Sequence, residues 1–126
     1  MGAKKERFPR SAAVHEAGHA VVARSFGLRV GAVWVNAGDA SGKTQIGSSG
    51  HLKLTDQVAV RCAGGMAQAI FECPANDFAT FQENLEIMKL LEANGYTVEN
   101  GALAARALGY ETAAAILEPI AKRCWR

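Results

Sequence analysis

Residues 15–19 of the sequence, His-Glu-Ala-Gly-His, place two imidazoles and a carboxylate in one short segment. The alanines and valines around this segment predict a helix. On a helix, residues four apart lie one turn apart on nearly the same face, so His15 and His19 can offer two nitrogens to one metal ion. Glu16 projects beside that pair, where it can reach a zinc-activated water without being a ligand. This spacing predicts a zinc hydrolase, and it requires a third ligand.

The third ligand must come from further along the chain, because a catalytic zinc site has three protein ligands and one open position. The extended motif with a third histidine is excluded, since Val22 and Ser25 stand at its Gly and His positions. The candidates are His51, Glu72, Cys73, Asp77, Glu83 and Glu86. Asp77 is favoured by its place at the start of a predicted helix. Aspartate there is also among the commonest helix caps, so both interpretations stay open.

The other candidates have competing explanations. His51 lies in a stretch rich in glycine and serine, which is typical of an exposed loop. Glu72 and Cys73 are close enough in sequence to the favoured aspartate to assist it or to replace it. Glu83 and Glu86 are interpreted as the solvated face of their helix.

The elements that must position these residues follow from periodicity and breakers. Pro9 and Ser11 predict that the first helix spans about residues 11–26. Residues 29–35 and 43–48 are predicted as the strands of one hairpin, which must lean on helices to be stable. Further helices are predicted from a cap at Thr55, over 77–94, over 97–108, and over 112–125 with a kink or break at Pro119. The predicted fold is mainly α (α+β), a zincin-like helical domain with one small β-hairpin.

Two adjacent glycines, Gly64 and Gly65, lie inside the predicted helix that begins near Thr55. Each glycine in a helix costs about 1 kcal/mol relative to alanine. Their presence predicts a close approach of another backbone, and the histidine-bearing helix is the obvious candidate. The alternative is that the helix breaks at the glycines. Gly18, between the two histidines, is likewise predicted to let another backbone pass close to the metal.

Composition limits the remaining possibilities. The chain has 126 residues, 49% hydrophobic content and a net charge of +2, which indicates one ordinary globular domain over 11–126 after a basic N-terminal arm over 1–10. The arm is usually a solvated tail, and the charge is too weak to argue for nucleic acid. Three cysteines without paired spacing, no apolar run of about 20 residues and no signal peptide predict a cytoplasmic protein without a membrane segment. The oligomeric state is not predicted.

Three segments resemble the peptidase domain of the FtsH-type ATP-dependent zinc metalloproteases. Residues 15–23 match the active-site helix of that family almost letter for letter, residues 58–67 resemble its Gly-Gly helix, and residues 75–80 resemble the segment that carries its third ligand. The resemblance covers about residues 11–94. It implies that His15, His19 and Asp77 bind Zn²⁺ and that Glu16 is the general base.

The chain also departs from that family. Gln68, Ala69 and Ile70 stand where the family carries a pair of glutamates, and the sequence has no Walker-type loop. ATP dependence therefore does not transfer, and we expect a stand-alone zinc metalloendopeptidase that hydrolyses peptide or protein substrates. The alternative is a catalytically inactive zinc-binding module with a regulatory or protein-interaction role. A nucleic-acid-associated protein that uses the basic arm is a third, weaker hypothesis.

Overall fold

The helix that carries both histidines is the first of four in a computed structural model. The model describes residues 2–36, 41–75 and 77–124, with only the backbone of residues 2–9 and 77. The elements in chain order are α1 (Gly2–Ser25), β1 (Val30–Asn36), β2 (Ser41–Ile46), α2 (Leu54–Ile70), α3 (Asp77–Ala93) and α4 (Ala102–Cys124). The described chain is thus mainly helical with one hairpin, which confirms the predicted mainly α (α+β) class with one small β-hairpin.

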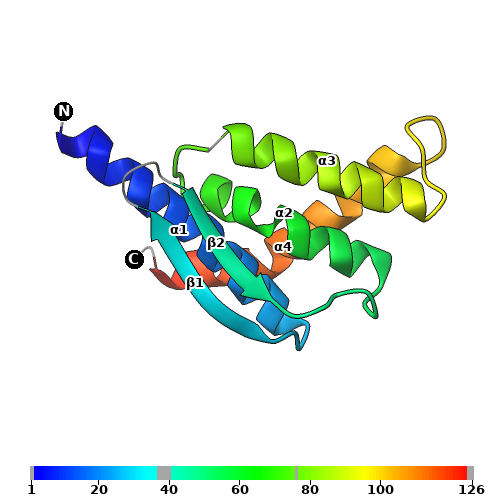
Figure 1. Cartoon of the computed structure of the whole chain (residues 1–126), viewed down its shortest axis with the longest axis horizontal. Coiled ribbons are helices and arrows are strands. Elements are labelled where there is room, and N and C mark those ends of the chain that lie inside the picture. Colours follow the sequence, from blue (N-terminus) through cyan, green and yellow to red (C-terminus); the bar gives the residue numbers. More distant parts are fainter. Residues whose placement is uncertain (1, 37–40, 76, 125–126) are drawn as a thin grey trace.

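Helix α2 is the centre of the arrangement. It packs against α1, α3 and α4, while the hairpin packs against α1. Figure 1 shows the hairpin lying across α1 on the side away from α3. The strands β1 and β2 are antiparallel, with Trp34 opposite Lys43 and an irregularity between Val30 and Val33. Such a small sheet depends on the helix beneath it, as the sequence predicted.

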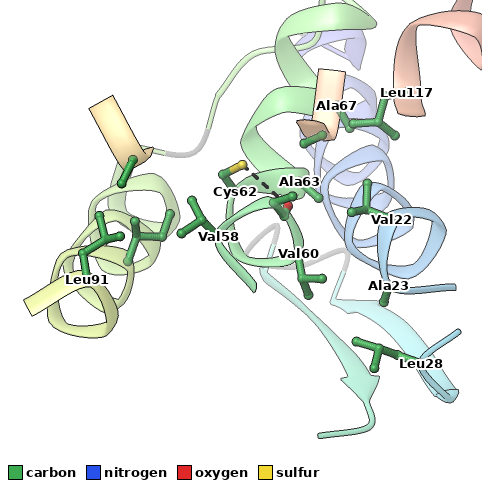
Figure 2. Packing of buried hydrophobic residues seen from close by; sticks show 14 of the residues in the cluster. Val22, Ala23, Leu28, Val58, Val60, Cys62, Ala63, Ala67, Leu91 and Leu117 are labelled. Carbon is green, nitrogen blue, oxygen red and sulfur yellow. Dashed lines mark hydrogen bonds between the residues drawn. The ribbon is translucent and has the colours of Figure 1, made fainter. Parts of the chain in front are cut away.

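The hydrophobic core lies where the helices meet α2. Val58 and Ala63 of α2 are fully buried, as are Val22 of α1 and Leu91 of α3, and Leu117 of α4 is almost fully buried. Figure 2 shows side chains from these helices grouped around α2. Burial of such side chains is the main favourable contribution to folding, so this contact fixes how the helices are placed. None of the described helices is both long and apolar enough to cross a membrane.

Several predicted boundaries were wrong. Helix α1 begins at Gly2 and not near residue 11, so proline at position 9 lies within the helix. The N-cap of α2 is Lys53, and Thr55 lies inside the helix. The helical spacing of Phe78, Phe81, Leu85, Met88 and Leu91 predicts one apolar stripe on α3, and this prediction is partly wrong because Phe78 and Phe81 are exposed.

The predicted stop at Gly109 and break at Pro119 do not occur, because α4 continues through both. Gly109 is buried against α2, where a Cβ built on it would lie 2.3 Å from Cγ1 of Val58. The glycine therefore serves a close helix contact. Pro119 lies on the exposed side of α4, as does Ala115, whose carbonyl loses the proline N–H as its partner. Water can satisfy that carbonyl, so the helix tolerates the proline.

A methyl group at Gly109 should destabilise the fold. We expect Gly109→Ala to lower the free energy of unfolding by about 1–3 kcal/mol, because overpacking against Val58 outweighs the gain in helix propensity. Gly65→Ala is the matched control, since the atom nearest to its added Cβ is Oγ1 of Thr80 at 4.0 Å. We expect that control to be neutral or up to about 1 kcal/mol more stable. Urea denaturation measures both, and equal stability of the two variants would contradict the close contact.

Candidate metal centre

Small residues bring α1 and α2 together at the histidines. A Cβ built on Gly18 would lie 2.6 Å from the carbonyl oxygen of Ala63, and one built on Gly64 would lie 2.5 Å from Nε2 of His15. The imidazole of His15 therefore lies directly over the backbone of α2. Helix α2 runs unbroken through both of its glycines. The predicted close approach of another backbone is confirmed at Gly18. At Gly64 the ring of His15 comes close instead of a backbone, and at Gly65 the nearest atom is Oγ1 of Thr80 at 4.0 Å, so the prediction was wrong for this pair. The alternative of a helix break is also wrong.

Two imidazole nitrogens and one carboxylate oxygen converge beside this contact. Nε2 of His15 lies 2.6 Å from Oε2 of Glu83, and Nε2 of His19 lies 2.7 Å from the same oxygen. The two Nε2 atoms are 3.2 Å apart. The side chains are 5%, 12% and 21% exposed for His15, His19 and Glu83, so the cluster is largely shielded from water. Helix α1 supplies the histidines and α3 supplies the glutamate.

The other nitrogen of each ring faces a hydrogen-bond acceptor. Nδ1 of His15 lies 3.1 Å from Oε1 of Gln68, and Nδ1 of His19 lies 2.8 Å from the carbonyl oxygen of Val60. The amide nitrogen of Gln68 donates to the carbonyl and hydroxyl oxygens of Ser11, which fixes Oε1 toward His15. We therefore assign a hydrogen to each Nδ1. A neutral imidazole then directs its Nε2 lone pair at the cluster, as in metal-binding histidines.

Lone pairs meeting at such distances require a cation between them. With no metal ion, a proton must fill this role, and an imidazolium then donates to Glu83. Burial by itself lowers the pKa of His15, but the hydrogen bond and charge of Glu83 outweigh burial and raise that pKa above its ordinary value. Burial raises the pKa of Glu83, but the hydrogen bonds and charges of the two histidines outweigh it and lower that pKa.

The cluster could hold a metal ion, because its three ligand atoms all lie within 4.8 Å of one another. Two imidazoles and a carboxylate are a donor set that zinc accepts. Tetrahedral bonds of about 2.0–2.1 Å separate ligand atoms by about 3.4 Å. The observed separations are 2.6, 2.7 and 3.2 Å, so outward shifts of less than 1 Å between the side chains would seat the ion. The donor set and the spacing fit a metal ion.

Glu16 lies outside the cluster, against the hairpin. Its side chain is almost buried, and its Oε1 accepts a hydrogen bond of 2.6 Å from the hydroxyl of Thr44 in β2. A Cβ built on Gly42 would lie 2.9 Å from its other carboxylate oxygen, so β2 passes directly over this group. Glu16 is still close enough to His15 for its charge to raise the pKa of that ring. It is adjacent to the cluster without belonging to it, as the motif predicts.

The predicted ligands have different outcomes. His15 and His19 are brought together as expected. The side chain of Asp77 lies outside the described residues, so its role stays a prediction; its backbone begins α3, about 9 Å of helix rise before Glu83. The interpretation of Glu83 as part of a solvated face was wrong, because this glutamate precedes Ile87 and Leu91 by one and two turns on the buried face of α3. That spacing was the signal in the sequence that could have identified it.

The remaining candidates lie apart from the cluster. His51, Glu72 and Glu86 are exposed. Cys73 is half-buried, and its thiol donates to the carbonyl oxygen of Phe71. In the described part of the chain, Glu83 is therefore the only candidate third ligand beside the two histidines.

Comparison with known protein families and with curated proteins finds no matching family model and no matching sequence.

Loss of the acceptor beside His15 should weaken metal binding. We expect Gln68→Met to lower zinc affinity by about 10–100-fold, because Nδ1 of His15 loses its partner and the ring loses its orientation. The matched control is Ser11→Ala, which removes one partner of Gln68 and leaves Oε1 on the histidine. Competition with a chromogenic chelator measures both affinities. An equal loss in the two variants would show that Gln68 acts only through packing.

Proposed function

We propose that this chain hydrolyses peptide bonds at a zinc ion held by His15, His19 and Glu83. The observation that carries this proposal is the convergence of two Nε2 atoms and one carboxylate oxygen, with each Nδ1 held by an acceptor and a second glutamate adjacent. The donor set suits zinc among the common metal ions. The resemblance of residues 15–23 to the active-site helix of zinc metalloproteases adds support from the sequence.

Each residue of the proposed site has a separate task. A bound zinc ion would supply Lewis acidity, which polarises the scissile carbonyl and lowers the pKa of water. Glu16 accepts a proton from the attacking water at its carboxylate and passes it to the leaving amine. Overall, water adds across the C–N bond to give a carboxylic acid and an amine. Thr44 is a positioning residue, because its hydroxyl donates to Oε1 of Glu16 and fixes the orientation of the carboxylate.

Removal of the general base should separate catalysis from metal binding. We expect Glu16→Gln to reduce peptide hydrolysis by at least about 100-fold while the bound zinc stays at the level of the unmodified protein. A fluorogenic peptide library and metal analysis of the purified protein measure the two quantities. Equal hydrolysis by both proteins would refute the role of Glu16. Absence of bound metal in both would refute the zinc site.

One observation favours an inactive zinc-binding module as the second candidate function. Glu16 is only 8% exposed and already accepts a hydrogen bond from the hairpin, which restricts its access to a substrate. In that case zinc would serve to join α1 and α3, because the ligands come from both helices. Bound zinc without hydrolysis of any peptide, in both the unmodified protein and Glu16→Gln, would favour this candidate.

The third ligand can be identified by paired amide substitutions. We expect Glu83→Gln to lower zinc affinity by more than the 10–100-fold typical of losing a supporting residue, because a neutral carboxamide is a poor zinc ligand. Asp77→Asn tests the aspartate that the sequence resemblance implied, and we expect its affinity to be unchanged. Isothermal titration with zinc measures both. The reverse outcome would assign the third position to Asp77.

A cytoplasmic location is also part of this proposal. The cysteines of the described chain, Cys62, Cys73 and Cys124, are all free, and Cys124 is exposed. Exposed free thiols are typical of reducing compartments, because oxidising ones favour disulfides.

A further inference from the structure

A pocket of about 200 Å³ lies between α2, α3 and α4 and has Glu83 in its wall. Met66, Ile87 and Cys62 contribute apolar surface to its lining, while Asn84 and Tyr110 contribute polar groups. Because Glu83 also belongs to the metal cluster, a molecule in this pocket lies next to the metal centre. Pockets for drug-sized ligands start at about 300 Å³, so this one has room for a single large side chain.

A positive charge without a carboxylate partner lies beside the pocket. Nη1 of Arg106 donates a hydrogen bond of 2.9 Å to Oδ1 of Asn84, and its guanidinium lies 5.8 Å from the ring centroid of Tyr110. Both of these neighbours line the pocket. Among the described residues, the carboxylate of Glu83 forms ion pairs with His15 and His19, and Arg106 forms no ion pair with a carboxylate.

The remaining donors of Arg106 suit a ligand carboxylate. A guanidinium has five N–H donors, and its planar fork matches a carboxylate with two parallel hydrogen bonds. Arg106 is only partly exposed, and its side-chain partner among the described residues is the neutral amide of Asn84. A ligand that fills the apolar pocket and also pairs with Arg106 must carry an apolar group and a carboxylate close together.

We infer that this pocket binds the C-terminal residue of a peptide substrate, with its apolar side chain in the pocket and its α-carboxylate on Arg106. In a peptide of apolar residues, only the last one carries both groups. The peptide bond that precedes this residue then lies at the metal centre, and its hydrolysis consumes one water and releases a free apolar amino acid. This inference rests on the proposed peptidase function and makes it a carboxypeptidase, in place of the endopeptidase expected from the sequence.

The carboxylate contact is tested with one peptide in two forms. We expect the zinc-loaded protein to release leucine from an N-terminally blocked peptide that ends in Leu with a free carboxylate. The same peptide with an amidated C-terminus should be cleaved at the same bond at least about tenfold less efficiently. Arg106→Gln should raise KM for the free acid about tenfold or more with little effect on the amide. Lys89→Gln, which removes an exposed cation of α3, is the control and should leave both unchanged.

Binding without turnover provides a second measurement. In the Glu16→Gln variant, NMR titration with the free-acid peptide should shift the methyl signals of Met66 and Ile87. Adding Arg106→Gln to this variant should weaken binding of the peptide about tenfold, as expected for KM. Gly65→Val narrows the pocket at a position with free space. It should weaken binding of the Leu-terminated peptide and leave an Ala-terminated peptide unaffected.

The outcomes distinguish this inference from the proposed function. Equal cleavage of the acid and the amide, or cleavage that is insensitive to Arg106→Gln, would overturn the carboxypeptidase assignment and leave the peptidase standing. Binding that depends on Arg106 without hydrolysis would support the pocket and overturn the peptidase. Hexanoate is the third probe, and binding of hexanoate as tight as that of the peptide would assign the pocket to small apolar acids instead.

Discussion

The close contact between α1 and α2 is the constraint on which the rest of the structure depends. Gly18 and Gly64 let each helix approach where a single methyl group would collide, and the imidazole of His15 occupies the space gained. With ordinary side chains at both positions the helices would stand further apart, and Gln68 of α2 would not reach Nδ1 of His15. The glycines lower the stability of the helices, but they allow the close contact in which the cluster of His15, His19 and Glu83 forms.

The cluster also links parts of the chain that are far apart in sequence. Helices α1 and α3 meet through the two histidines and Glu83, at the edge of the core around α2. The two Nε2 atoms and one carboxylate oxygen of Glu83 lie 2.6–3.2 Å from one another, so a cation placed among them would be attracted to all three. A metal ion that binds only the folded chain would therefore add its binding free energy to stability. A metal ion at these three side chains would thus couple its binding to folding.

The sequence predicted the parts of the site that depend on local spacing. The i, i+4 histidines and the adjacent Glu16 follow from helix geometry, and the structure places them as expected. Glu83 shares the buried face of α3 with Ile87 and Leu91, but exposed aromatic residues such as Phe78 obscured which face of that helix is buried. The predicted helix end at residue 108 was wrong for a similar reason, because the role of Gly109 is set by Val58 on another helix. In both helices, contacts with other helices determine the role of the residue, and local spacing does not show them.

The site has two dissimilar sides, and this asymmetry explains how a substrate would be oriented. On one side the hairpin covers α1 and holds Glu16 through Thr44. On the other, α3 carries Glu83 together with the wall of the apolar pocket, and it packs against α2 and α4. A scissile bond at the metal would have the proton acceptor on its hairpin side and the apolar pocket on its α3 side. The fixed positions of these groups, and not the metal alone, would then determine which end of a peptide enters the pocket.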